Sequence, residues 1–200
     1  VVQLAGCQAH WMAEGARIAE DAGADIIDIN MGCPARHVTG GQSGSALMRD
    51  LDHAVTLIDA TIAAVKVPVT LKMRLGWDDR SLNSPELARR AEASGVQMIT
   101  VHGRTREQFY TGSADWSAIR AVRDAVPDLP LVANGDVVDA ASARAALSQA
   151  KAEVQVLEAK RDSAALDVRS AQTGLRLAQR DLDFTRVRAP FDGILTERQI

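Results

Sequence analysis

The residues with the clearest chemical potential lie at positions 25–34, which read D-I-I-D-I-N-M-G-C-P. Their isoleucines predict a strand that is buried on both faces, as in a parallel sheet. The strand ends abruptly, because Gly32 permits unusual backbone angles and Pro34 favours an extended residue before it. The sequence therefore predicts that the thiol of Cys33 and the carboxamide of Asn30 lie at the carboxyl end of a buried strand. A lone cysteine is more often a small buried residue than a reactive one, so its role depends on its neighbours.

Polar side chains recur at the ends of the other predicted strands. These residues are Gln3, Lys72, Arg74, His102, Asn134 and Asp136. Taken singly, the lysine, arginine and histidine would more often be edge charges or structural hydrogen-bonding groups, and Asn-Gly is a common turn sequence. Beside Cys33 and His102, the lysine and arginine favour a functional site over isolated edge charges.

The elements that must position these residues alternate between strand and helix. The expected strands are 1–4, 25–31, 69–73, 98–101 and 131–133, and the expected helices are 11–22, 51–65, 85–93 and 116–126. Repeated strand–helix units with short loops predict a parallel α/β fold. Periodicity alone leaves both a doubly wound sheet and a TIM-type barrel open. The polar residues after every strand favour the barrel, because all its strand ends converge on one mouth.

A glycine-rich segment, residues 39–45, follows the cysteine. It lacks the lysine of a phosphate-binding P-loop and does not join a strand to a helix in the way that a P-loop does. We therefore expect a mobile loop over the substrate. Further along the chain, Asp139 has the residue type and position to cap another helix.

Composition limits the classes of protein that need to be considered. The chain has 200 residues, 46% of them hydrophobic, and a net charge of −3, which suits one ordinary domain with a sizeable core. Cys7 and Cys33 lack the spacing of a metal site or a disulfide framework, so no metal is predicted. The sequence contains no transmembrane segment and no signal peptide. Because the chain starts in strand-like sequence at Val1 without an initiator methionine, we expect a truncated N-terminus.

Five ordered motifs carry a resemblance to a known family. They are Q-L-A-G, D-I-N-M-G-C-P, L-K-M-R-L-G, V-H-G-R-T-R with a later A-D-W, and A-N-G-D. In this order and spacing the chain resembles the flavin-dependent tRNA-dihydrouridine synthases, from residue 1 to about residue 146. The resemblance implies an incomplete (β/α)8 barrel of about five strands, with FMN over its mouth. It also implies that NADPH reduces the FMN and that hydride passes to a uridine of tRNA, which becomes 5,6-dihydrouridine.

The resemblance also implies a role for each candidate residue. Cys33 would donate the proton to the uracil, while Asn30 and Arg74 would face the substrate base. The residues that would hold FMN are Gln3, Lys72, His102, Asn134, Gly135 and Asp136. The residue types suit this chemistry, since a lysine can donate to the flavin ring and stabilise negative charge on its reduced form. The target uracil would have to leave its stack, as it does for other enzymes that act on bases.

The last quarter of the chain has a different pattern. Apolar residues recur at alternating spacings of three and four, interrupted by Arg161: Leu147, Ala150, Val154, Leu157, Ala164, Val168, Ala171, Leu175, Ala178 and Leu182. This heptad repeat predicts a coiled-coil helix of about 40 residues. The ending T-R-V-R-A-P-F-D-G-I then resembles the periplasmic adaptor (membrane-fusion) proteins of efflux and secretion pumps, which implies half of a lipoyl-like β domain.

These observations together predict a fusion of two incomplete parts. The domains expected are an incomplete FMN-binding barrel at 1–146, a coiled-coil helix at 147–183 and a half lipoyl-like β segment at 184–200. The expected function is that of a cytoplasmic tRNA-dihydrouridine synthase, impaired by truncation. The alternatives are an adaptor subunit, which would act in the periplasm with pump components, or a non-functional chimera. Helix–helix self-association through 147–183 is expected in either case.

Overall fold

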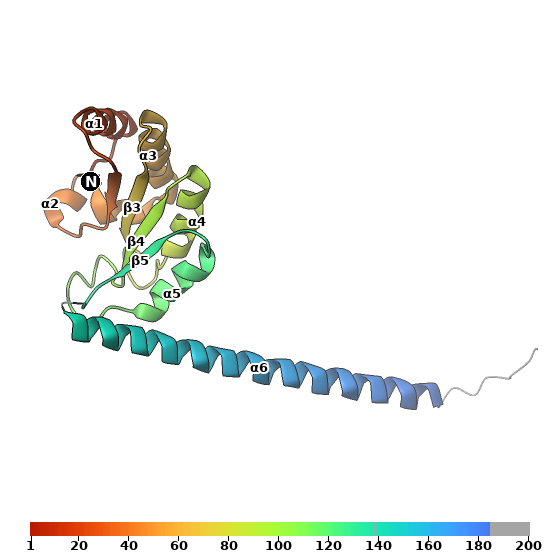
Figure 1. The fold of residues 1–200 in the computed structure, drawn as a ribbon. Coiled ribbons are helices and arrows are strands. Elements are labelled where there is room, and N and C mark those ends of the chain that lie inside the picture. Colours follow the sequence, from red (N-terminus) through yellow and green to blue (C-terminus); the bar gives the residue numbers. More distant parts are fainter. Residues whose placement is uncertain (138, 185–200) are drawn as a thin grey trace, which may run out of the picture. The chain divides into compact units, whose positions relative to one another are not determined.

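A computed structural model describes residues 1–137 and 139–184. The chain forms two compact units, Val1–Ala150 and Lys151–Ile200. Five parallel strands make one sheet in the first unit (Figure 1). They are β1 (Val2–Leu4), β2 (Ile27–Met31), β3 (Val69–Arg74), β4 (Met98–His102) and β5 (Leu131–Asn134).

The order of the strands decides between the two architectures that the sequence left open. Each strand pairs in parallel with the next strand of the sequence, in the order β1-β2-β3-β4-β5. The winding therefore never reverses, whereas a doubly wound sheet has a reversal at its switch point. Sequential parallel strands with intervening helices are the arrangement of a (β/α)8 barrel. The fold is α/β and partial TIM-barrel-like, as predicted.

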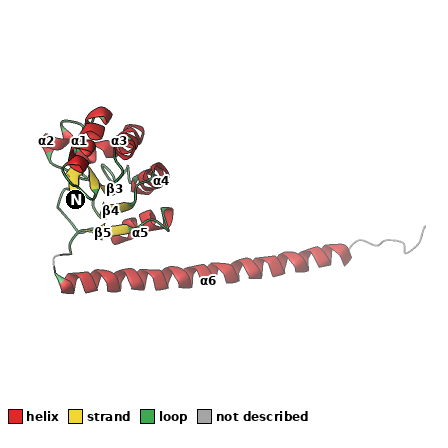
Figure 2. Ribbon diagram, turned by 45° about the horizontal axis from the view of Figure 1, so that its top comes forward, coloured by secondary structure: helices red, strands yellow, loops and turns green. Residues whose placement is uncertain are grey.

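Helices cover one face of this sheet. They are α1 (Ala9–Asp21), α3 (Leu51–Ala64), α4 (Ser84–Ser94) and α5 (Trp116–Ala125). They pack in chain order, α1 on α3, α3 on α4 and α4 on α5 (Figures 1 and 2). Local signals set their ends, since Asp50 and Asp115 accept bonds from the first turns of α3 and α5, and Gly95 ends α4 with a φ of 104°.

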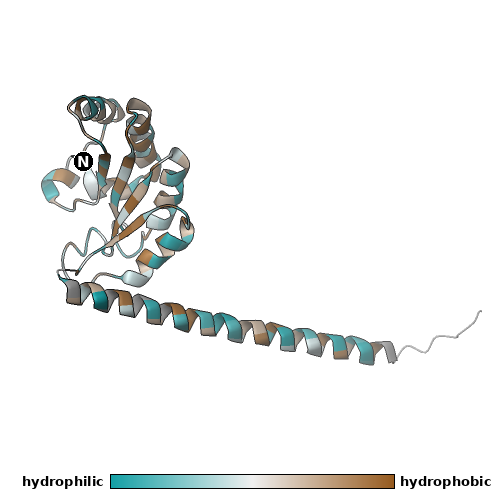
Figure 3. Cartoon of the chain, viewed as in Figure 1, coloured by the Kyte–Doolittle hydropathy of each residue, from teal (hydrophilic) through white to brown (hydrophobic). Residues whose placement is uncertain are grey.

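The two faces of the sheet differ in polarity. In β2, Ile27, Ile29 and Met31 are buried in the core under the helices, while Asp28 and Asn30 are half-buried on the other face. The prediction of a strand buried on both faces was therefore wrong. The polar residues of the motif alternate with the apolar ones, because successive side chains of a strand point to opposite faces. Figure 3 shows the apolar parts of the strands in brown.

The glycine-rich segment after β2 is more ordered in its packing than expected. It runs from the end of the short helix α2 (Arg36–Thr39) into the start of the 3-10 helix η1 (Gly44–Arg49). Gly44 and Ser45 are buried, and the backbone N–H of Ser45 donates to the carbonyl oxygen of Cys33 at 3.0 Å. The end of the segment therefore supports the turn at residues 32–34, which we name the cysteine turn, and a mobile loop over the substrate stays a prediction.

The predicted long helix is present as α6 (Ala140–Phe184), which has 45 residues. Asp139 caps it, because its Oδ1 accepts from the backbone N–H of Ser142 at 2.7 Å. The helix has no break before Val154. Most of the seam side chains whose burial is described are solvent-exposed, with Leu157 53% and Leu175 62% accessible. Pairing of this seam with a second helix stays a prediction. The β segment expected at 184–200 falls almost wholly outside the described residues, and at its first residue, Phe184, the chain is still in α6.

Within the described residues, no helix combines the length and the apolar composition that crossing a membrane requires.

The connection after β3 generates a prediction about stability. A methyl group at Gly76 would overlap the carbonyl oxygen of Ser81, a backbone atom that cannot rotate away. We expect Gly76→Ala to lower the free energy of unfolding by about 1–3 kcal/mol, as overpacking does. Gly174→Ala is the matched control, because nothing lies within 4 Å of its added carbon and alanine favours a helix. Urea unfolding followed by circular dichroism would measure both, and equal stability of the two variants would contradict the prediction.

Candidate active site

The polar face of the sheet gathers the predicted residues from separate strands. In-register neighbours of parallel strands point to the same face, and Asn30 of β2 pairs with Lys72 of β3. Two residues further along β3, Arg74 pairs with His102 of β4. On the other side of β2, Asp28 pairs with Gln3 of β1. The candidate residues of four strands therefore share one surface near the carboxyl ends of the strands.

The backbone around Cys33 is held from both sides. The Oδ1 atom of Asn30 accepts from the backbone N–H groups of Gly32 and Cys33, at 3.1 and 2.9 Å. The carbonyl oxygen of Cys33 accepts from the hydroxyl of Ser45 at 2.9 Å. The thiol itself is free and half-buried. These contacts fix the position of the sulfur without using it, which leaves it available for chemistry.

The glycine that this turn requires differs from the one expected. Gly32 has no positive φ, and an added carbon there would make ordinary contacts of 3.5 Å or more. Gly44 has a φ of 60°, and an added carbon would come within 2.7 Å of the carbonyl oxygen of Cys33. The close approach of η1 to the cysteine turn is therefore what demands a glycine.

Asn30 and Gln3 belong to a hydrogen-bond network on this face. Asn30 Nδ2 donates to Gln3 Oε1 at 2.8 Å, and Gln3 Nε2 donates to Asp28 at 2.6 Å. The hydroxyl of Thr70 donates to the other oxygen of Asp28 at 2.7 Å. The Asn30 side chain thus already bonds the cysteine turn and Gln3, and only one Nδ2 hydrogen remains for a ligand. These bonds fix the cysteine turn, and a contact of Asn30 with the substrate stays a prediction.

Lys72 contributes a positively charged side chain to this face of the sheet. It is half-buried, and no hydrogen bond or ion pair joins its Nζ to another described residue. Burial lowers the pKa of Lys72, as does the nearby positive charge of Arg74, while Asp28 and Cys33 oppose the shift. A half-buried ammonium without a bonding partner can donate to an electron-rich ligand at this surface.

Arg74 is buried, contrary to its expected place against the substrate. Its side chain is 1% exposed, and its Nε donates to the carbonyl of Gly32 at 2.9 Å. Its Nη1 donates to the carbonyls of Thr105 and Phe109, at 2.9 and 2.8 Å. These bonds direct the guanidinium to the backbone, so the geometry favours a positioning residue for Arg74 rather than a substrate contact. It joins the turn after β2 to the loop after β4.

His102 is a neutral acceptor at its Nε2 atom. An arginine can only donate, so the 3.3 Å contact from Arg104 Nη1 assigns the lone pair to Nε2 of His102. Burial lowers the pKa of His102 to about 4, and the positive charges of Arg74, Lys72 and Arg104 act in the same direction. The ring lies 6.4 Å from that of Tyr110, centroid to centroid. With the proton on Nδ1, the imidazole can donate one hydrogen bond to a ligand.

The turn at residues 134–136 serves the packing of the loops. Asp136 bonds Arg104 at 2.5 Å and the backbone N–H of Ala114 at 2.5 Å, and these bonds lower its pKa. An added carbon at Gly135, where φ is 129°, would lie 2.8 Å from the Cβ of Ala114. Both oxygens of Asp136 bond the protein, and a contact of its side chain with a cofactor stays a prediction. Asn134 is exposed and remains a candidate ligand contact.

Three residues of this site were missed by the sequence analysis. Asp28 sits at the centre of the Gln3 and Thr70 bonds, and Arg104 bonds His102, Asp136 and two loop carbonyls. Tyr110 packs beside His102 and lies 5.6 Å from the Arg74 guanidinium. The alternation of D-I-I-D-I-N could have identified Asp28, since it shares a face with Asn30.

Comparison with known proteins assigns the chain to a family. The family model described as "Dihydrouridine synthase (Dus)" matches residues 1–166. The chain belongs to the dihydrouridine synthase family. Since the match extends to residue 166, the junction predicted at residue 147 lies inside the region that resembles the family. The comparisons give no support to a fusion with an adaptor protein.

Several curated relatives of this family member are named tRNA-dihydrouridine synthases. A probable tRNA-dihydrouridine synthase of Rhizobium leguminosarum bv. phaseoli is 64% identical over 157 residues, which cover 78% of this chain and 49% of that protein. A probable tRNA-dihydrouridine synthase of Rhodobacter capsulatus is 67% identical over 151 residues, which cover 76% of this chain and 46% of that protein. The tRNA-dihydrouridine synthase B of Pectobacterium carotovorum is 46% identical over 156 residues, covering 78% and 48%. The chain thus spans about half the length of the curated relatives it matches.

A solved structure also matches part of this family member. It is a nitroalkane oxidase from Streptomyces ansochromogenes, with a TM-score of 0.36 and 20% sequence identity, covering 66% of this chain and 33% of that one. At this level of similarity it adds nothing to the assignment.

The position of His102 among positive charges generates a prediction about pH. Its pKa of about 4 lies below the ordinary 6.5, so the folded chain binds this proton less well than the unfolded chain. The stability that His102 contributes is complete above about pH 6.5 and is lost as the pH falls toward 4. A titration of the His102 ring by NMR should show a midpoint near pH 4, and Lys72→Met should raise it. A midpoint near 6.5 in the intact family member would contradict this environment.

Proposed function

We propose that this chain carries the catalytic part of a tRNA-dihydrouridine synthase, which reduces uridine in tRNA to 5,6-dihydrouridine with FMN as cofactor and NADPH as reductant. The observation that carries the proposal is the position of the Cys33 thiol, which is held at the end of β2, beside the half-buried Lys72. Family membership supports the same reaction. Since tRNA is its substrate, we place the activity in the cytoplasm.

The residues present fit an isoalloxazine ring. Lys72 offers an ammonium without a bonding partner in the described part of the chain, and a flavin accepts hydrogen bonds at its ring nitrogens and carbonyls. His102 offers a donor at Nδ1, and Gln3 and Asn134 are exposed at the ends of β1 and β5. Bound FMN would supply the hydride that uridine receives. We propose that Lys72, His102, Gln3 and Asn134 contact it, with Asp136 and Gly135 acting through the turn that they form.

Cys33 is proposed as the proton donor. The C5=C6 double bond of uracil is conjugated with its C4 carbonyl, so a hydride added at C6 leaves negative charge on C5 and O4. A proton must then reach C5, and the S–H bond of Cys33 breaks as the C5–H bond forms. Lys72 stabilises a thiolate electrostatically after the transfer, because its charge lies close to the sulfur. Hydride and proton together account for the two added hydrogens.

Arg74 and Asn30 are proposed to position the donor. Each binds the backbone of the turn that carries the sulfur, and a misplacement of about 1 Å at a reacting atom can cost about 100-fold in rate. Residues 1–146 are proposed as the flavin-binding part. The exposed seam of α6 is proposed to pair with a second helix, since an unpaired apolar stripe of this length favours association.

Replacement of Cys33 tests the assignment of the proton donor. We expect Cys33→Ala to retain FMN binding and to lose about 10²–10⁴-fold in the rate of dihydrouridine formation, because the thiol transfers a proton and makes no cofactor contact. Cys7→Ala is the matched control, since only the backbone carbonyl of Cys7 bonds the protein, to His53 at 2.9 Å. Product would be measured on an unmodified tRNA transcript. Unchanged turnover in Cys33→Ala would show that Cys33 is not the proton donor.

Replacement of Lys72 tests the cofactor site. A charge-assisted hydrogen bond contributes about 1.5–3 kcal/mol, so we expect Lys72→Met to weaken FMN binding by roughly 10- to 150-fold. Lys66→Met provides the control, because it removes an exposed lysine that lies before β3 rather than on the polar face. Flavin fluorescence quenching gives both affinities. If the two variants bind FMN equally well, Lys72 does not contact the cofactor.

A further inference from the structure

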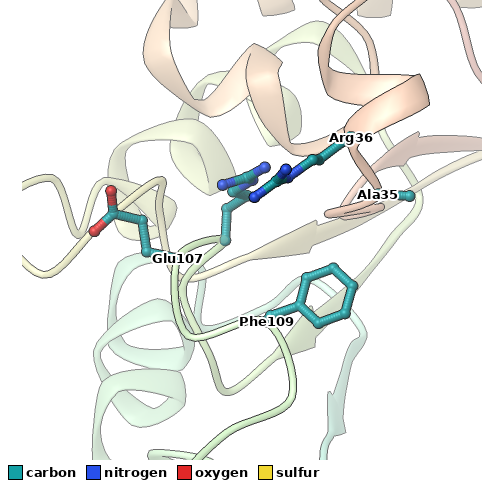
Figure 4. A pocket seen from close by; sticks show the side chains of 5 residues that line it. Ala35, Arg36, Glu107 and Phe109 are labelled. Carbon is teal, nitrogen blue, oxygen red and sulfur yellow. The ribbon is translucent and has the colours of Figure 1, made fainter.

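A second basic site borders the cysteine turn. It is a pocket of about 490 Å³ (Figure 4). The pocket is lined by Ala35, Arg36, Arg106, Glu107 and Phe109. Since Ala35 and Arg36 follow Cys33 and Pro34 directly in the chain, the pocket adjoins the proposed active site without being part of it. Figure 4 shows the Arg36 side chain reaching inward from the start of α2.

The positive charge of this pocket is not neutralised by the protein. Among the described residues, no ion pair joins Arg36 or Arg106 to a carboxylate, and Glu107 lines the pocket without forming one. The Nε atom of Arg106 is buried and has no hydrogen-bond partner. A buried donor without an acceptor is costly, so this nitrogen indicates a ligand that brings an acceptor oxygen.

Arg106 is held in place for such a ligand. Its guanidinium lies 4.7 Å from the centre of the Trp77 ring, and its backbone N–H donates to the carbonyl of Gly76 at 3.0 Å. The guanidinium of Arg49 lies 4.9 Å from the same ring. Arg106 therefore shares the pocket with Arg36 and the Trp77 ring with Arg49. We name these three residues the arginine row.

The side chain of Arg74 connects the wall of the pocket to the cysteine turn by hydrogen bonds. Arg74 donates to the carbonyl of Phe109, in the pocket wall, and to the carbonyl of Gly32, next to Cys33. The Phe109 ring is 44% exposed and packs edge-to-face on Tyr110 with 4.7 Å between centroids. The wall thus offers an apolar surface for a ribose or a base beside the arginines.

We propose that the arginine row binds phosphodiester groups of the RNA strand next to the reacting uridine. This inference rests on the proposed function for the choice of RNA. Planar guanidinium groups bind phosphate oxygens in pairs of parallel hydrogen bonds, which matches the free donors of Arg36 and Arg106. Residues 1–145 carry 14 basic and 18 acidic residues, so the attraction for RNA has to come from a local cluster rather than from net charge.

RNA affinity as a function of salt tests the proposal without flavin or turnover. The probe is a fluorescently labelled, unmodified tRNA transcript, and the measurement is anisotropy at several salt concentrations. Arg36→Gln and Arg106→Gln should each weaken binding at least fivefold and reduce the slope of log K against log[salt] by about 0.7–0.9, the effect of one lost phosphate contact. Arg36→Lys should retain the slope while losing part of the affinity. Arg89→Gln on α4, which removes an exposed arginine paired with Glu86, should change neither.

Two results on RNA binding would overturn the proposal. RNA binding that is absent from the intact chain, or that keeps its affinity and slope in both variants, would do so. NADPH also carries phosphates, so its binding is measured separately with the same variants. Weaker NADPH binding with unchanged RNA binding would assign the pocket to the nucleotide instead. Circular dichroism and thermal unfolding verify the fold, and Arg36→Gln gives a result even if Arg106→Gln unfolds through loss of its Trp77 contact. Normal RNA binding without dihydrouridine formation would reject the proposed function, while the proposal that the pocket binds RNA would stand.

Discussion

The structure of the site depends on one buried guanidinium. Arg74 extends from the end of β3 and binds carbonyl oxygens of the turn after β2 and of the loop after β4. Carbonyls buried at the end of a sheet need donors, and a single arginine supplies several in a fixed planar arrangement. The loops that carry Cys33 and Phe109 are therefore placed relative to each other by a side chain from the strand between them. This bridge fixes the loop that carries Phe109 against the turn that carries the thiol.

Around this bridge, the sheet separates two kinds of environment. Its apolar face packs under α1, α3, α4 and α5 and supplies the burial that stabilises the fold. Its polar face holds a network of amide, hydroxyl and carboxylate groups, together with cations that the protein compensates only in part. Burial, together with the positive charges nearby, lowers the pKa of His102 and keeps its ring neutral, and the excess of positive charge suits ligands that are anionic or rich in electrons. A chain with a net charge of −3 thus presents local positive sites where the proposed chemistry needs them.

Much of the fold and of the site could be predicted from the sequence. The strands and helices predicted between residues 1 and 134 agree with the observed ones to within about two residues, because Gly95, Asp50 and Asp115 provide start and stop signals that act locally. The short helices α2 and η1 were not predicted, and α6 begins at Ala140, seven residues before the expected start of the coiled-coil helix. The candidate residues Asn30, Lys72 and His102 do share one face. Features that depend on long-range contacts could not be predicted from the sequence. The burial of Arg74, the use of both Asp136 oxygens and the packing of Ser45 on Cys33 all join residues that are 12 or more positions apart.

By itself, the sequence determined the alternation of strand and helix, the long α6 and the motifs that identify the family, since these follow from periodicity, local caps and residue types. Only the tertiary structure decided the order of the strands, which distinguishes barrel from doubly wound sheet, and the polarity of each sheet face. The tertiary structure also decided which polar side chains are exposed to solvent and which form hydrogen bonds with the backbone. Hydrogen-bond partners depend on which loops come together in space. Gly44 rather than Gly32 is the glycine that the cysteine turn requires, for the same reason: the neighbour that limits it, the carbonyl oxygen of Cys33, approaches only once η1 has folded over the turn.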